Sequence, residues 1–359
     1  MDIQQLETFC NLQENGMLAV KNDKALFVNS AFQKRYPNIS AEDALGALLP
    51  VIIVQAEQEH FLTQTHFFQQ DVNIQAAKLG DVFLYTILPT EKMEEGAMIR
   101  SLTSAMRRKL MALHLTVDQL SDRKLSVQQL QSSLQLLNKT YYQLQRICDN
   151  ADYFFRLQDD DVSLQLKNVN LIVFLSDLIR TIDHFAKDMG FRVFFHTDLD
   201  SLETAIDAHK ITKLLLNIFC NSMQVMSEGD KLRIQLRQQD KHVVLCICDT
   251  GPGIQTESLG RAPYLRDVLH LPPHAGVGLG IPVSHEIVKL HGGTMLIGGD
   301  ERKGGTNVIV RFPIQKISIA DELHQEQNIY GESLDSIRTI LMELSEVLSS
   351  DAYARKYLD

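Results

Sequence analysis

The sequence predicts an α+β protein of several domains, and three observations support this prediction. Residues 1–92 and 152–315 both mix strand-like with helical runs, a pattern typical of helices layered on a sheet. Residues 96–151 instead carry apolar side chains at the 3,4 spacing of two long helices. We therefore expect a small N-terminal α/β domain, a helical hairpin, a two-layer α/β sandwich and, over residues 316–359, a C-terminal helical tail.

The N-terminal segment has the order of a small α/β layer. Residues 17–32 predict a strand, a turn at Asn22 and Asp23, a second strand and the start of a helix. Residues 81–89 predict a later strand, because β-branched and aromatic side chains dominate this run up to Pro89.

Residues 96–151 carry two heptad seams, one from Ile99 to Leu120 and one from Val127 to Cys148. With a short turn between them, these helices form an antiparallel hairpin. One hairpin offers too little surface to bury both seams, so we expect a second copy to complete a four-helix bundle in a homodimer. A helical spacer within one chain is the alternative.

Composition limits the function classes. The chain has 359 residues, of which 45% are hydrophobic and 22% charged, an ordinary globular balance. Its net charge of −10 argues against nucleic-acid binding, which needs clustered basic residues. The sequence contains no apolar run long enough for a transmembrane helix, and it begins without the pattern of a signal peptide. The five cysteines do not suggest a disulfide framework, so we expect a cytoplasmic protein.

Two segments of the sandwich carry polar groups suited to a ligand. Asn217 and Asn221 lie four residues apart on one predicted helix, and an amide oxygen is a hard ligand that suits Mg²⁺. Asp249 ends an apolar strand, where a carboxylate can accept a hydrogen bond from an exocyclic amine. Gly251 and Gly253 follow and allow the backbone to approach a flat ring.

Two glycine-rich segments follow in order. Residues 276–281 lead into a helix, and glycines at such a point leave amide groups free for phosphate oxygens. Thr306 follows two glycines and begins the last strand. Taken singly, these segments also fit helix-capping amides, an ordinary Asp-Gly turn and a plain glycine-rich loop. The combination of these segments in this order and spacing is much more specific than any one segment alone.

This order over residues 155–315 resembles the Bergerat-type ATP-binding fold of histidine kinases, DNA gyrase, the Hsp90 chaperones and the MutL repair proteins (GHKL). The resemblance implies ATP and Mg²⁺ as cofactors, with Asn221 as the Mg²⁺ ligand and Asn217 in support. It implies that Asp249 binds the adenine base, with Thr306 nearby. The further nucleotide-binding residues that it implies are Gly251, Gly253, Ile254, Gly276, Gly278, Leu279 and Gly280.

The whole layout resembles a cytosolic sensor histidine kinase of two-component signal transduction, which implies a response regulator as partner. In the ATPase branches a Glu that activates water stands where this chain has Asn217, so we expect slow hydrolysis and favour the kinase branch. Residues 1–92 resemble a PAS sensor domain, with a plain α+β domain as the alternative. Residues 255–275 would form the lid, with Arg261 and Arg266 as candidate phosphate contacts.

The phosphoacceptor segment departs from the family pattern. Where such kinases read His-Glu-Leu-Arg-Thr-Pro-Leu, this chain has Ser104 and Ala105 in place of the histidine and its acid. His114, about 15 Å further along the helix axis, is the candidate phosphoacceptor. Gln224 replaces the usual Lys, and the lid lacks the usual paired phenylalanines.

These features leave two functions open. The first is an enzyme that transfers the γ-phosphate of ATP to a histidine, and the second is a degenerate kinase that binds ATP and regulates a partner without autophosphorylation.

Overall fold

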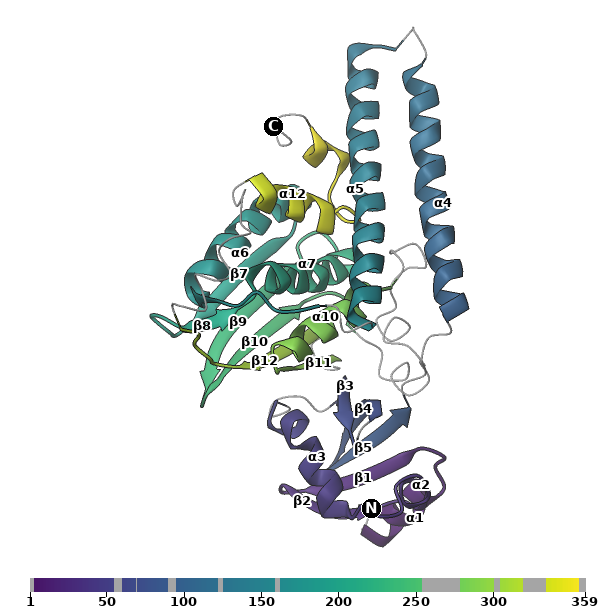
Figure 1. The fold of residues 1–359 in the computed structure, drawn as a ribbon, viewed down its shortest axis with the longest axis vertical. Helices are drawn as coiled ribbons and strands as arrows, with labels where there is room; N and C mark the ends of the chain where they lie inside the picture. Colours follow the sequence, from purple (N-terminus) through teal and green to yellow (C-terminus); the bar gives the residue numbers. More distant parts are fainter. Residues whose placement is uncertain are drawn as a thin grey trace. The chain divides into compact units, whose positions relative to one another are not determined.

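The computed structural model describes residues 3–54, 60–68, 70–89, 95–121, 125–158, 162–253, 278–299, 304–318 and 334–354. Strands and helices follow one another along this chain, which confirms the predicted α+β class (Figure 1). The chain divides into two compact units. The first comprises residues 1–92, 252–270 and 294–311, and the second comprises residues 93–251, 271–293 and 312–359.

The first unit is built on an antiparallel sheet with the strand order β2-β1-β5-β4-β3-β11-β12. The predicted turn between the first two strands is confirmed, because Asn22 and Asp23 both have positive φ angles, of 48° and 58°. The elements of this unit are α1 (Ile3–Asn11), β1 (Gly16–Lys21), β2 (Lys24–Val28), α2 (Ser30–Arg35), α3 (Ala41–Val54), β3 (His60–Phe67), β4 (Gln70–Leu79), β5 (Val82–Pro89), β11 (Thr294–Gly299) and β12 (Thr306–Pro313).

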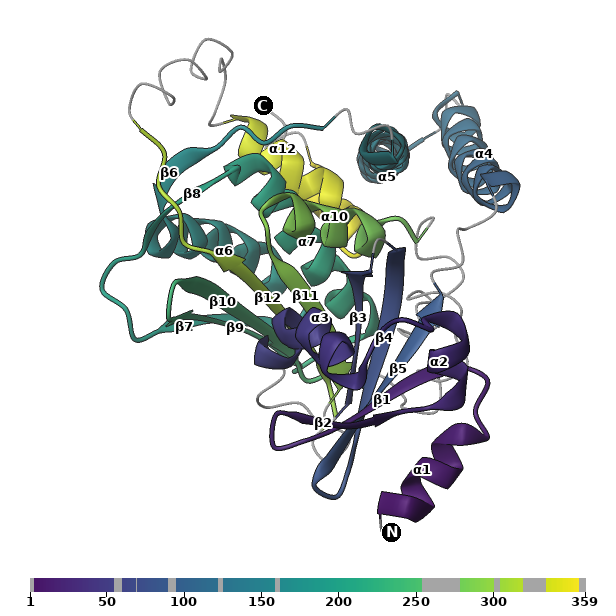
Figure 2. The ribbon, with the colours of Figure 1, turned by 60° about the horizontal axis from the view of Figure 1, so that its bottom comes forward.

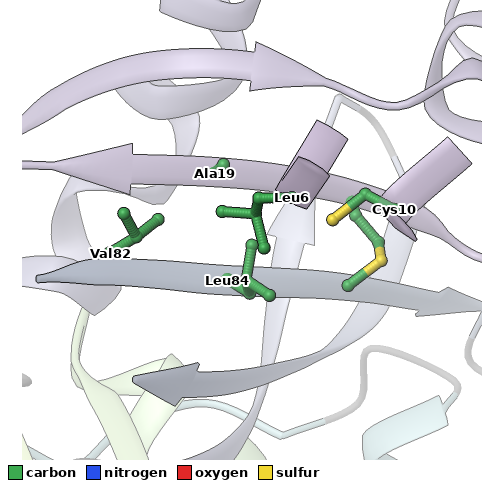
Figure 3. Close-up of a cluster of buried hydrophobic side chains, with 6 residues drawn as sticks. Leu6, Cys10, Ala19, Val82 and Leu84 are labelled. Atoms are coloured by element: carbon green, nitrogen blue, oxygen red, sulfur yellow. The ribbon is translucent and has the colours of Figure 1, made fainter. Parts of the chain in front are cut away.

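Helix α1 covers part of this sheet with a small apolar cluster. Leu6 and Cys10 of the helix pack against side chains of β1 and β5, among them Ala19 and Leu84 (Figure 3). Buried Asn29 ties the neighbouring segments together. Its Oδ1 accepts from the backbone of Met17 and Phe32, and its Nδ2 donates to the carbonyl groups of Cys10 and Asn15.

The second unit contains strands β10-β9-β7, of which β7 and β9 are parallel, and the antiparallel pair β6-β8. Helices α7 and α10 lie side by side (Figure 2). The elements are α4 (Glu95–Leu120), α5 (Val127–Gln158), β6 (Lys167–Asn170), α6 (Leu171–Asp188), β7 (Arg192–Thr197), β8 (Glu203–Ile206), α7 (Ala208–Val225), β9 (Lys231–Gln239), β10 (His242–Asp249), α10 (Gly280–Leu290), α12 (Leu334–Glu343) and the 3₁₀ turn η2 (Ser350–Tyr353).

Helices α4 and α5 form the expected hairpin (Figure 1). Several seam side chains remain exposed in the single chain, including Leu110 at 51% and Val127 at 73%. This exposure leaves apolar area for a second copy, and the four-helix bundle stays a prediction. None of the described helices combines the length and apolarity that crossing a membrane requires.

Candidate nucleotide site

Asp207 fixes the start of α7, the helix that carries Asn217 and Asn221. Asp207 caps α7, where its Oδ1 accepts from the Lys210 backbone at 3.0 Å and its Oδ2 accepts from Lys210 Nζ at 2.6 Å and from the Gln165 backbone at 3.0 Å. Burial works against the charged carboxylate, but these hydrogen bonds outweigh it and lower the pKa of Asp207. The cap therefore stays ionised and fixes the first turn of the helix.

Asn217 lies fully buried in the middle of α7. Its Oδ1 accepts a hydrogen bond from Arg146 Nη2 at 3.2 Å, and its Nδ2 has no hydrogen-bond partner among the residues that the structure describes. The first residue of α10 also packs on it, since a β-carbon at Gly280 would lie 3.3 Å from Oδ1. Asn221 is half-buried one turn further along α7. The structure thus brings Asn217 and Gly280 close together.

Asp249 ends β10 and forms a tight turn with the glycine that follows. Its Oδ1 accepts from the backbone of Gly251 at 3.0 Å. A β-carbon at Gly251 would lie 3.2 Å from this oxygen and 3.6 Å from Val225 and Met226. The turn therefore rests against the C-terminal end of α7, and a β-carbon at Gly251 would press on Asp249 Oδ1.

The residues before α10 have two different roles. Gly278 takes a positive φ of 78°, a conformation that favours glycine. Leu279 is buried in a cluster with Leu102 and Ala105 of α4 and Ile147 of α5. Its side chain anchors α10 to the hairpin, so packing accounts for this residue in the structure. The same cluster explains why α5 continues to Gln158, because Ala151, Phe154 and Phe155 also pack on it.

Gly253 and Thr306 belong to the first unit. Gly253 has a φ of 75°, and a β-carbon there would lie 2.8 Å from the carbonyl oxygen of Gly305. This close approach requires glycine and brings Gly253 next to the glycine that precedes Thr306. Other predicted positions lie outside the described residues: Ile254, Gly276 and the lid 255–275 with Arg261 and Arg266.

The candidate phosphoacceptor is exposed on α4. His114 Nε2 lies 3.5 Å from Asp118 Oδ2, with the His114 side chain 67% exposed. Asp118 was not identified from the sequence, although its i,i+4 spacing from His114 on one helix indicates this contact. Ser104 is also exposed, and its Oγ accepts from Arg108 Nη1 at 2.9 Å.

The described residues contain no group of three or more His, Cys, Asp or Glu side chains suited to a metal. Mg²⁺ is commonly held by one or two protein oxygens together with nucleotide phosphates, so a single amide at Asn221 fits this mode. The oxygen of Asn217 fits less well, because it already faces the guanidinium of Arg146.

Residues 206–316 match the family of histidine kinase-, DNA gyrase B- and HSP90-like ATPases. Sensor histidine kinase YvrG of Bacillus subtilis (strain 168) is 24% identical over 174 residues, or 48% of this chain and 30% of that protein. Sporulation kinase D of the same organism is 34% identical over 108 residues, or 29% of this chain and 20% of that protein. The chain thus spans less than a third of the length of either relative.

Among solved structures, the histidine kinase ThkA in complex with the response regulator protein TrrA is similar, with 15% identity and a TM-score of 0.47. That likeness covers 88% of this chain and 99% of the other. The matched domain, its motifs in order on α7, β10 and α10, and the kinase relatives lead to one family. Residues 206–316 therefore form a domain of the histidine kinase-, DNA gyrase B- and HSP90-like ATPase family, and the relatives that this chain is similar to are histidine kinases.

Proposed function

We propose that the chain binds Mg·ATP and transfers the γ-phosphate to His114. The observation that carries this proposal is the exposed pair on α4, in which the carboxylate of Asp118 lies 3.5 Å from His114 Nε2. A carboxylate at this distance accepts the ring proton as the other nitrogen attacks phosphorus. The N–P bond then forms while the bond from the γ-phosphorus to its bridging oxygen breaks, and ADP leaves.

The nucleotide would be held by the polar and glycine-rich motifs between Asn217 and Thr306. Asp249 would accept a hydrogen bond from the adenine amine, and Asn221 would hold Mg²⁺, which neutralises phosphate charge when bound. The other contacts proposed for ATP are Asn217, Gly251, Gly253, Ile254, Gly276, Gly278, Leu279, Gly280 and Thr306.

The remaining parts of the chain would carry the signal. Residues 1–92 would act as a PAS-like sensor domain, and the exposed seam of the hairpin supports a homodimer. The partner would be a cytoplasmic response regulator that takes the phosphoryl group from His114.

Labelling with γ-labelled ATP and Mg²⁺ tests this proposal. We expect acid-labile label on the wild type, none on His114→Ala, and at least about 100-fold slower labelling of Asp118→Asn, because a positioned acid–base group contributes that much. The matched control Ser104→Ala should label like the wild type. Label that is stable to acid and lost in Ser104→Ala would instead identify the serine as the acceptor.

A degenerate kinase is the second candidate, favoured by Ser104 at the usual phosphoacceptor position. Its hydroxyl is engaged with Arg108, and Ala105 beside it offers no proton acceptor. Such a protein would bind Mg·ATP and change the state of a partner. Saturable nucleotide binding with no label on any residue would support this candidate and exclude transfer to His114.

A further inference from the structure

Three helices of the second unit bury a charged triad, formed by Arg146 of α5, Lys213 of α7 and Glu343 of α12. Arg146 Nε donates to Glu343 Oε2 at 3.1 Å, and Lys213 Nζ donates to Glu343 Oε1 at 2.6 Å. The Glu343 side chain is 1% exposed and the two cations are 9% exposed. Figure 1 shows the C-terminal helix α12 beside α5 and α7.

The triad depends on its single carboxylate. Burial alone would raise the pKa of Glu343, but the charges of Lys213 and Arg146 outweigh it and lower that pKa. Glu343 therefore stays ionised. Removing its charge would leave two buried cations unpaired, which is far costlier than losing an exposed ion pair.

The C-terminal segment is also fastened to the hairpin at residues that follow Glu343. Gln143 Nε2 donates to the carbonyl group of Ser345 at 3.0 Å, and Lys139 Nζ donates to that of Leu348 at 2.6 Å. Glu346 also pairs with Lys109 of α4 at 3.2 Å. The segment is thus held in one register along the hairpin, and that register places Glu343 at Arg146.

The far side of Arg146 reaches the nucleotide helix. Its Nη2 donates to Asn217 Oδ1 at 3.2 Å, and this contact fixes which end of the amide is oxygen. A metal cation is disfavoured at an oxygen that already faces a guanidinium. The Nδ2 donor is buried without a partner among the described residues, so a ligand acceptor that reaches it forms a new hydrogen bond.

We infer that Glu343 and Arg146 are positioning residues of the nucleotide site, which hold the Asn217 amide so that Nδ2 donates to a phosphate oxygen of bound Mg·ATP. This inference rests on the proposed nucleotide binding. It makes the C-terminal segment part of the site, and it assigns Asn217 as a donor while Asn221 alone serves as the metal ligand.

The variant Asn217→Asp tests the role of the Nδ2 donor separately from the role of the Oδ1 oxygen. The new carboxylate keeps the contact with Arg146 and loses the NH₂ group, so the melting temperature should stay at or above that of wild type. We expect the affinity of the full chain for Mg·ATP, measured by calorimetry, to fall at least tenfold. If the oxygen of Asn217 ligated Mg²⁺, a carboxylate there would instead tighten Mg²⁺ binding, and that result would overturn the inference.

A second pair of variants separates positioning from folding. Glu343→Gln should weaken Mg·ATP binding about tenfold, but its unpaired cations also threaten the fold. The triple variant Arg146→Met, Lys213→Met and Glu343→Leu replaces the whole triad by apolar side chains, a change that buried ion pairs often tolerate. It should keep the wild-type melting temperature and still lose about tenfold in affinity. Tyr353→Phe, which removes only a hydrogen bond to Leu341 in the same segment, is the matched control with unchanged affinity.

The outcomes distinguish the two levels of the proposal. A wild-type chain that does not bind Mg·ATP overturns the proposed function and this inference together. A wild-type chain that binds, with Asn217→Asp and the folded triple variant binding equally well, overturns only the inference. Tighter binding by the triple variant would also overturn it, since the triad would then restrain the site.

Discussion

At the scale of single residues, His291 connects the end of α10 to the start of α7. Its Nδ1 donates to the carbonyl group of Ile287 at 2.8 Å, and its Nε2 accepts from the backbone of Asp207 at 3.2 Å. Both bonds are made at once only by the neutral ring that carries its proton on Nδ1. Burial lowers the pKa of His291 and outweighs the opposing effects of Ile287 and Asp207.

This geometry predicts a pH-dependent stability. In the unfolded chain, His291 takes up a proton near its ordinary pKa of about 6.5. In the folded chain, His291 takes up this proton only at a lower pH. The free energy of unfolding should therefore keep its full value above about pH 6.5. At lower pH it should decrease, by at most about 1.4 kcal/mol per pH unit. Urea unfolding between pH 7.5 and 5.5 measures this slope. His291→Asn should flatten it, whereas exposed His209→Asn should not, and equal slopes in all three proteins would contradict the prediction.

Two glycines allow a matched test of packing against the nucleotide helix. A β-carbon at Gly280 would press on Asn217 Oδ1 at 3.3 Å, while one at Gly46, in α3, would meet nothing within 4 Å. Gly46→Ala should stabilise the chain by about 0.5–1 kcal/mol and leave nucleotide affinity unchanged. Gly280→Ala should weaken Mg·ATP binding several-fold, as measured by calorimetry. Equal affinities in both variants would show that the Asn217 side chain can shift without any effect on Mg·ATP binding.

At the scale of elements, the hairpin is expected to join two chains. Leu110 on α4 and Leu134 on α5 are exposed at 51% and 46% in the single chain, and both lie on the predicted seams. Leu110→Glu and Leu134→Glu should convert a dimer into monomers, because a charge on a buried seam is strongly unfavourable. Light scattering on the full chain measures the mass. Leu12→Glu, at a residue 78% exposed outside the hairpin, should leave the mass unchanged, and a monomeric wild type would refute the bundle.

Local patterns predicted some elements and missed others for physical reasons. The hairpin, α7 and β10 follow from apolar periodicity, and Asp249 with Gly251 from turn chemistry at a strand end. Strands β3, β4 and β8 were not predicted individually, because β3 and β4 mix polar and apolar side chains and β8 has only four residues. In the charged triad, Glu343 is separated by 130 positions from Lys213 and by 197 positions from Arg146. No local sequence pattern therefore indicates this contact.

At the scale of the whole molecule, nucleotide binding should appear as added stability. A ligand that binds only the folded chain stabilises it by about 2.7 kcal/mol at a concentration 100 times its dissociation constant. For a chain of this size, that corresponds to a rise in melting temperature of several degrees. The rise should be largest with Mg²⁺ and ATP together, because the proposed site holds the metal through both Asn221 and the phosphates.

Two variants locate this effect in the molecule. Asn221→Ala should melt like the wild type without ligand and lose most of the Mg-dependent part of the shift. Asp249→Asn keeps an oxygen for the bond from Gly251 but lacks the charge that would favour the adenine amine, so it should lose the shift with or without Mg²⁺. A full shift in Asp249→Asn would place the nucleotide away from the end of β10. A full Mg-dependent shift in Asn221→Ala would assign the metal to another oxygen, because the metal contributes to the shift only through the ligands that hold it.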